Sequence, residues 1–270
     1  PKVVGGNCHY AALKGNGTVW TWGYNGNGQL GLGDTNARTE PTQAKAEKIL
    51  EDGTKEEELI TDAIDIAASY NHTIILRADG TVWSTGYNQY GELGTGDTEE
   101  RKIFTQVKGP NGEGILENIV QITTGYYTGY ALTTNGEVYG WGENGSGQLG
   151  ISNTEDQKLP VKTTLTNIKQ ISTSYYHTIA LTEDGKAYVA GRNSEGELGI
   201  GQTTSSTITT WTIMKSTNGT SEMTGIKQVA TGYMHTVVLT DNGYMYATGN
   251  NGYYQLSDGS STQRKNLVYM

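Results

Sequence analysis

The apolar and polar positions along the chain form short, strand-length runs separated by turn residues. The clearest run is 176–191, where an apolar stretch is followed by Asp184-Gly185 and then by a second strand-like stretch. An Asp-Gly or Asn-Gly pair is the strongest short signal of a β-hairpin, because a type I′ turn needs positive φ at both central residues. The pattern therefore predicts a hairpin with a type I′ turn at Asp184-Gly185.

The same hairpin recurs along the whole chain. Asp or Asn precedes each turn glycine, another glycine follows six residues later, and consecutive turns are 49 to 63 residues apart. Around each hairpin we expect an inner strand, a short bend, the two hairpin strands, a glycine-rich loop and an outer strand. The turn glycines are Gly17, Gly80, Gly136, Gly185 and Gly243. Repeats of this kind, with about four strands each, are typical of propeller blades.

These repeats predict an all-β fold, a β-propeller of four-stranded blades in a single repeat domain. The blades are expected at about 1–62, 63–118, 119–167, 168–225 and 226–270. Five repeats either close a five-bladed ring or form part of a larger propeller. An incomplete ring would expose two blade faces and favour self-association.

Three spacers lengthen the repeats. Residues 47–65 are strongly acidic and are expected to form a short helical turn or a solvated loop, and 108–114 are expected to form a turn-rich loop. Residues 211–220 are expected to extend an outer strand into a hairpin. Because all three come at the same place in the repeat, we expect them on one side of the propeller.

Composition supports this interpretation and restricts the partners. Glycine (38) and tyrosine (18) are abundant and phenylalanine (1) is rare, as suits many short strands joined by tight turns. The net charge of −9 argues against a nucleic acid or an anionic membrane as the main partner. A single cysteine, Cys8, excludes an internal disulfide, and no apolar run is long enough to span a membrane. No leader is visible, but the chain begins at Pro1, so this says nothing about export.

The most complete copy of the motif lies in the second repeat, at 70–76, 79–83 and 86–98. This motif resembles the regulator of chromosome condensation repeat, and the resemblance covers almost the whole chain outside the spacers. It implies a β-propeller, commonly of about seven blades in this family. Two copies depart from the pattern: the third has Thr128-Gly129 in place of the histidine and the residue after it, and the fifth has Tyr254 and Ser257 in place of loop glycines.

Four histidines suggest a metal or catalytic site at first sight. They occupy one repeat position, so we interpret each imidazole as a structural group that satisfies buried backbone groups beside the next blade. The repeated Gln/Glu-Leu pairs are interpreted as loop fasteners. The histidines are His9, His72, His177 and His235. No nucleophile, zinc-type or phosphate-binding motif is present, so we expect no catalytic residues, no metal and no cofactor.

The bends just before the histidines vary from copy to copy, and most are aromatic. Tyrosine and methionine are enriched in protein-binding surfaces, so these bends are candidate partner-binding residues. The alternative is that they only pack against neighbouring bends. The candidates are Tyr70, Asn71, Tyr126, Tyr127, Tyr175, Tyr176, Tyr233 and Met234.

The leading functional hypothesis is a non-catalytic, bacterial-type propeller scaffold that docks a partner protein through one face. The Tyr, Thr and Asn content favours an exported or cell-surface module. One alternative, implied by the founding member of the family, is a guanine-nucleotide exchange factor for a small GTPase. Another is a carbohydrate-binding lectin whose tyrosines stack on sugars.

Overall fold

The computed structural model describes residues 1–270, which form five β-sheets and one short 3-10 helix, η1 (Pro110–Gly112). The first sheet contains β1 (Lys2–Gly5), β2 (His9–Leu13), β3 (Val19–Gly23) and β4 (Arg38–Gln43). The second contains β7 (Ala63–Ser69), β8 (His72–Arg77), β9 (Val82–Gly86) and β10 (Arg101–Gln106), with β5 (Lys45–Ile49) and β6 (Lys55–Leu59) beyond β10.

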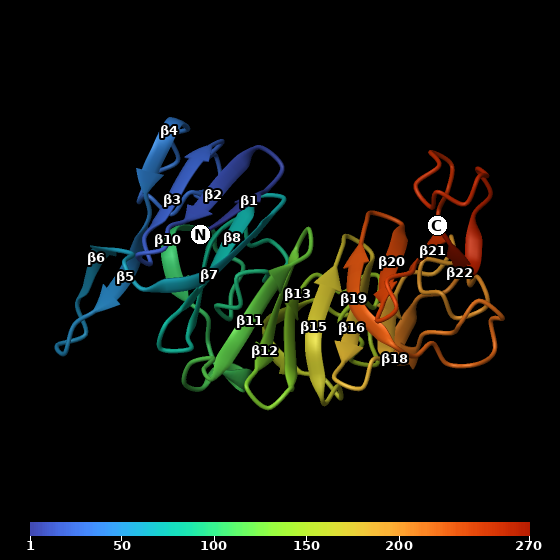
Figure 1. Cartoon of the computed structure of the whole chain (residues 1–270). Coiled ribbons are helices and arrows are strands. Elements are labelled where there is room, and N and C mark those ends of the chain that lie inside the picture. The colour runs from blue at the N-terminus through green and yellow to red at the C-terminus, as the bar shows by residue number, and fades with distance from the viewer. The chain divides into compact units, whose positions relative to one another are not determined.

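Each of the other three sheets has four strands in chain order (Figure 1). The third contains β11 (Ile119–Thr124), β12 (Thr128–Thr133), β13 (Val138–Gly142) and β14 (Gln157–Lys162). The fourth contains β15 (Ile168–Thr173), β16 (His177–Thr182), β17 (Ala187–Gly191) and β18 (Ile208–Ile213). The fifth contains β19 (Ile226–Thr231), β20 (His235–Thr240), β21 (Met245–Gly249) and β22 (Arg264–Tyr269). The chain is therefore all-β and is built from propeller-type blades.

The chain divides into two compact units. One consists of Pro1–Thr134, Tyr139–Glu143 and Asp156–Lys162, and the other of Asn135–Val138, Asn144–Glu155 and Thr163–Met270. We describe the packing inside each unit separately.

The hairpin turns differ from the expected type I′ geometry. Gly185 has φ of 78°, but Asp184 is not in the left-handed region. The Gly185 N–H donates to the Thr182 carbonyl (3.1 Å) and the Thr182 N–H to the Lys186 carbonyl (2.8 Å). These bonds describe a longer loop, in which the glycine closes a type I turn as a bulge. The prediction of the hairpin was right, and the prediction of its turn type was wrong.

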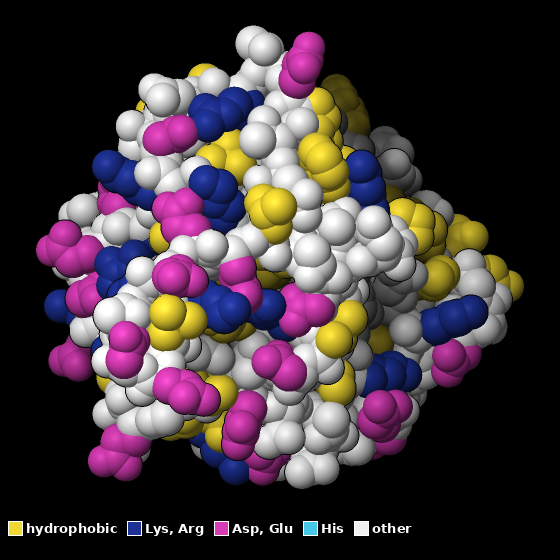
Figure 2. All heavy atoms as spheres, turned by 90° about the vertical axis from the view of Figure 1, so that its left-hand side faces the viewer, with side chains coloured by type: hydrophobic (Ala, Val, Ile, Leu, Met, Phe, Trp, Pro, Cys, Tyr) yellow, Lys and Arg dark blue, Asp and Glu magenta, His cyan; other side chains and the backbone are white.

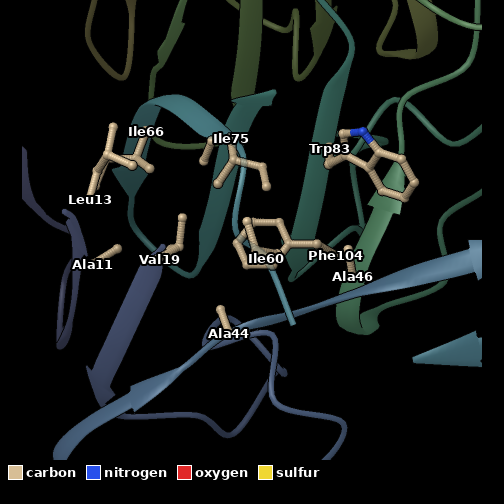
Figure 3. Packing of buried hydrophobic residues seen from close by; sticks show 11 residues of the cluster. Ala11, Leu13, Val19, Ala44, Ala46, Ile60, Ile66, Ile75, Trp83 and Phe104 are labelled. Carbon is tan, nitrogen blue, oxygen red and sulfur yellow. The ribbon is translucent and has the colours of Figure 1, made fainter. Parts of the chain in front are cut away.

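The acidic spacer is a β-hairpin, so the expected helical turn or solvated loop was wrong. Strands β5 and β6 (light blue in Figure 1) lie beyond the outer strand of the second sheet, where Ala46 pairs in parallel with Phe104. Ala46 and Ile60 are fully buried with Phe104 in one core cluster (Figure 3). This burial of apolar side chains holds the hairpin against the sheet, although its outer face is acidic.

Ion pairs offset part of the acidity of this hairpin. Lys45 pairs with Glu57 (2.9 Å), and Arg77 of β8 pairs with both Glu58 (2.9 Å) and Asp62 (2.8 Å). Figure 2 shows charged side chains of both signs interspersed over the face that lies on the left in Figure 1. The segment is thus an ordered, mixed-charge strand pair.

Within each unit, consecutive sheets meet where the glycine-rich loop of one repeat lies against the outer strand of the next, and we call this contact a joint. Gly196 has φ of 81°, and a Cβ there would lie 2.5 Å from the Cα of Lys265 in β22. In the fifth repeat the same position is Tyr254, which keeps φ of 63° and is exposed. Glycine is therefore required where a following outer strand approaches, and the exposed fifth loop tolerates tyrosine.

A second part of the joint is a histidine–threonine pair. Nε2 of His177 lies 2.8 Å from the hydroxyl of Thr236, which donates to the Glu197 carbonyl (2.7 Å). His9 and Thr73 are paired in the same way at 2.9 Å. We expected each imidazole to satisfy buried backbone groups beside the next blade. At these two joints its Nε2 meets the threonine hydroxyl of the next repeat, and that hydroxyl donates to the loop carbonyl.

The joint between the second and third repeats uses another residue pair. Gly129 replaces the threonine, and a Cβ there would lie 2.3 Å from the Trp141 ring, which fills the space. Nε1 of Trp141 donates to the Glu92 carbonyl (2.8 Å), the bond that threonine makes elsewhere. The substitution therefore keeps the bond to the loop carbonyl but leaves His72 without a threonine hydroxyl.

Glu92 is a buried carboxyl group in a loop position that is glutamine in three other repeats (Gln29, Gln148 and Gln255) and glutamate in the fourth repeat (Glu197). Its Oε2 accepts the Tyr90 N–H (2.9 Å), and its Oε1 is buried without a partner. At Gln148 the equivalent amide donates to the Tyr175 carbonyl (3.3 Å). Burial raises the pKa of Glu92 from 4.5 to about 8, so the side chain is mainly protonated at neutral pH.

The joint predicts unequal losses of stability at two equivalent loop positions. Gly196→Ala should lower the free energy of unfolding by roughly 2–3 kcal/mol, because the new Cβ meets the β22 backbone at positive φ. Tyr254→Gly should change it by less than about 1 kcal/mol. Denaturant unfolding of the two variants measures both values, and equal losses would contradict this account of the joint.

The buried carboxyl group predicts a pH-dependent stability. Because the folded-state pKa of Glu92 is raised, the unfolded chain loses this proton first, so stability falls between about pH 4.5 and 8. Glu92→Gln should remove that fall and add roughly 1–3 kcal/mol at pH 9.

Glu197→Gln is the matched control for this change. Burial also raises the pKa of Glu197, but Nε of Arg192 lies 3.8 Å from its Oε1 and favours the charged form. Glu197→Gln should therefore add less stability at pH 9 than Glu92→Gln does. Thermal unfolding across this pH range gives the comparison. Parallel curves for wild type and Glu92→Gln would refute the assignment of the proton to Glu92.

Candidate protein-binding surface on the bends

Each bend connects the first and second strands of its sheet, at the same end as the glycine-rich loops. The Asn7 N–H donates to the Tyr70 carbonyl (2.9 Å), so the bends of the first two repeats are joined directly. The carbonyls of Asn71 and Met234 accept the N–H groups of Tyr87 and Asn250, each at 2.9 Å. Bend and loop of a repeat are thus fixed together by the backbone.

In the unit built on Pro1–Thr134, the bend tyrosines form an aromatic cluster. Tyr70 stacks on Tyr126 (ring centroids 5.3 Å apart) and meets Tyr127 edge-on (5.1 Å). Tyr127 also contacts Tyr87 (5.8 Å) and Tyr90 (4.8 Å) from the loop after β9. All five rings are half-buried. We call Tyr70, Tyr87, Tyr90, Tyr126 and Tyr127 the first tyrosine cluster.

Sequence reasoning missed Tyr87 and Tyr90, which lie outside the bends. Both come from the loop segment 86–91, in which only the glycines are given a role by the sequence pattern. The bends and the glycine-rich loops share one end of the sheet, so an aromatic residue on either can reach the cluster. Such residues between the loop glycines would have been the signal.

In the other unit, Tyr175, Tyr176 and Tyr233 form the second tyrosine cluster. Tyr176 lies 4.3 Å from Tyr175 and 5.2 Å from Tyr233, and the hydroxyls of Tyr176 and Tyr233 are 3.2 Å apart. The Arg192 guanidinium lies over the Tyr176 ring at 4.8 Å. Tyr233 remains 48% exposed. A rigid aromatic surface beside a cation results.

The two candidate residues that are not tyrosines contribute less side-chain surface. The Asn71 side chain accepts the Gln29 amide at 3.4 Å, and Met234 is half-buried. The packing of bend on bend that we kept as an alternative is present in both units. Partner binding by the remaining exposed ring surface is untested and stays a prediction.

A hollow of about 270 Å³ lies next to the first tyrosine cluster. Its lining consists of backbone-rich positions of the first two bends and two stacked rings. The residues are Gly5, Gly6, Asn7, Ser69, Tyr70 and Tyr126. The combination of an aromatic wall and polar groups can accommodate a side chain of a docked protein.

The four histidines do not belong to either tyrosine cluster. Burial lowers the pKa of His9 to about 4 and those of His72 and His177 to about 3, and it also lowers the pKa of His235. Neutral, buried imidazoles fit a structural role at the joints. No group of three or more His, Cys, Asp or Glu side chains is placed to hold a metal ion. The only helix, η1, is far too short to cross a membrane.

Known proteins share the sequence pattern. The family model of the RCC1-like domain matches residues 1–268. The human X-linked retinitis pigmentosa GTPase regulator is 35% identical over 161 residues, 59% of this chain and 14% of the relative. The Arabidopsis thaliana ultraviolet-B receptor UVR8 is 35% identical over 162 residues, 59% of this chain and 33% of the receptor. The chain thus spans a third or less of these relatives, and both are eukaryotic, which gives no support to the expected bacterial type.

Solved structures share the fold. Human WBSCR16 superposes with a TM-score of 0.77 at 20% identity, over 99% of this chain and 65% of that one. Yeast RCC1 (Prp20), solved with Kap60 bound, superposes with a TM-score of 0.69 at 20% identity, over 99% of this chain and 74% of that one. Together with the blade-type sheets and the family match over nearly every residue, these likenesses show that the chain belongs to the RCC1-like domain family.

Proposed function

We propose that this chain is a non-catalytic binding module that docks a partner protein through the bends and neighbouring loops. The observation that carries the proposal is the pair of tyrosine clusters, which place half-exposed rings in fixed positions. Tyrosine gives a large contact area for a small loss of conformational freedom, which is why it is common among residues that dominate binding energy. Ring-on-ring packing fixes these side chains before a partner arrives.

Binding of proteins also agrees with the relatives. Yeast RCC1 was solved with Kap60 bound, and another study of Prp20p concerns its binding to Gsp1p and histones. The present chain is acidic overall, with a net charge of −9, so a basic partner surface would be favoured electrostatically. Arg192 above Tyr176 offers one local site for a carboxylate or an aromatic ring.

A second candidate function is regulation of a small GTPase, including nucleotide exchange. The observation in its favour is the 35% identity to a human protein named as a GTPase regulator. Exchange also needs only protein contacts that distort the nucleotide site of the partner, so it would use the same kind of surface. The lectin alternative has the hollow beside Tyr70 and Tyr126 as its possible site.

Truncation of three bend tyrosines tests the main proposal. The triple change Tyr126→Ala, Tyr175→Ala and Tyr233→Ala should reduce capture of the specific partner from source-cell extract by more than about tenfold, because hot-spot rings are lost. The melting temperature should stay within about 5 °C, since these rings are not core residues.

The matched control uses an exposed tyrosine away from the bends. Tyr244→Ala removes a ring that is 49% exposed, and capture should persist. Quantitative mass spectrometry of the captured proteins distinguishes the variants. Equal capture by wild type and the triple variant would overturn the bend-face proposal.

Nucleotide release and glycan binding separate the other functions. When the chain is added to a panel of purified small GTPases loaded with fluorescent nucleotide, we expect the nucleotide to be released at the intrinsic rate. On a glycan array we expect no binding. Accelerated release by the chain would favour exchange. Glycan binding that is lost with Tyr70→Ala would favour the lectin.

A further inference from the structure

We propose that the outer edge of the fifth sheet, strand β22, accepts an extended acidic segment of a partner protein as an additional β-strand. A groove of about 420 Å³ runs along this strand. Its lining consists of Thr203, Thr217 and the consecutive residues 263–268. Since β22 is the last strand of its sheet, its outward backbone groups have no neighbouring strand in this sheet.

The same molecule shows this kind of strand addition elsewhere. In the second sheet the outer strand β10 is followed by β5, which pairs with it in parallel at Phe104 and Ala46. Leu267 occupies the place of Phe104, three residues after the arginine that begins the strand, and both side chains are fully buried. The outer edge of this type of blade is therefore able to bind a strand.

Corresponding hydrogen bonds confirm that β10 and β22 are equivalent. The Gly33 N–H donates to the Lys102 carbonyl of β10 (2.8 Å), and the Gly201 N–H donates to the Lys265 carbonyl of β22 (3.1 Å). Both loop glycines come from the preceding repeat.

Residues 215–222 of the fourth repeat begin where β5 begins, because the Lys215 N–H donates to the Gly199 carbonyl (2.9 Å) as the Lys45 N–H donates to the Gly31 carbonyl (2.8 Å). Unlike β5, these residues form no strand paired with the outer strand, and the groove is the space left beside them.

The insertion of the fourth repeat covers only part of this edge. This insertion, residues 215–222, is closed by an isolated bridge between Lys215 and Glu222. Its Gly219 approaches β22 closely, since a Cβ there would lie 2.7 Å from Oδ1 of Asn266. That Oδ1 atom is buried and has no hydrogen-bond partner. An incoming strand with its N–H groups toward β22 would supply a donor at this depth.

Charge determines the chemical class of the segment. The groove lining contains two cations, Arg264 and Lys265, and no carboxylate. Arg264 is already paired with Asp258 (2.6 Å), whereas the Lys265 side chain is exposed. A glutamate or aspartate on the incoming strand would pair with Lys265. Lys102, at the equivalent place in β10, shows that lysine here does not prevent strand addition.

The experiment selects a displayed library of random peptides of about eight residues against the whole chain. Selected peptides should contain a carboxylate, have no proline in their centre, and slow hydrogen exchange at residues 263–268. Lys265→Glu should weaken their binding by about tenfold or more. Lys102→Glu, at the covered edge, should change it by less than about twofold.

The outcomes discriminate this site from the bend surface. The variant with Ala at 126, 175 and 233 should bind the selected peptides as wild type does, so failure of one proposal leaves the other intact. Unchanged melting temperatures of both glutamate variants confirm that folding is preserved. Absence of selected peptides, protection elsewhere, or equal loss in Lys102→Glu and Lys265→Glu would overturn the proposal.

Discussion

Close approach of backbone to backbone at the joints is the constraint on which the structure depends. Where a loop glycine such as Gly196 lies against the next outer strand, there is no room for a side chain, and the positive φ also favours glycine. The joint then aligns the histidine with a hydroxyl of the following repeat. The same alignment positions neighbouring bends so that their tyrosine rings meet. Binding surface and fold are thus both consequences of one contact.

Much of the architecture could be predicted from sequence because it depends on local signals. The turn glycines and the period of the repeats predict the five hairpins that lie at the centre of the sheets. The hairpin of β5 and β6 could not be predicted, since its stability comes from burial of Ala46 and Ile60 beside Phe104, which is distant in sequence. The turn type was wrong because the glycine, and not the preceding Asp or Asn, carries the positive φ.

The candidate site was partly predictable for the same reason. The bends were recognisable as variable positions in a fixed motif, and the structure brings their tyrosines together within each unit. Tyr87 and Tyr90 were missed because their proximity to Tyr127 depends on how loop and bend share one end of a sheet. The protonated state of Glu92 depends on its burial, and the groove along β22 depends on the path of the fourth repeat's insertion. An alignment of the repeats shows neither the burial nor the path.

The exchange of threonine for the Gly129–Trp141 pair has a consequence for which single substitutions the third sheet tolerates. Both residues belong to this sheet, Gly129 in β12 and Trp141 in β13, and the Trp141 ring fills the place that a side chain at 129 would take. Threonine at 129 alone would therefore create a clash, and a smaller residue at 141 alone would leave a cavity and remove the donor to the Glu92 carbonyl. The two positions can change only together.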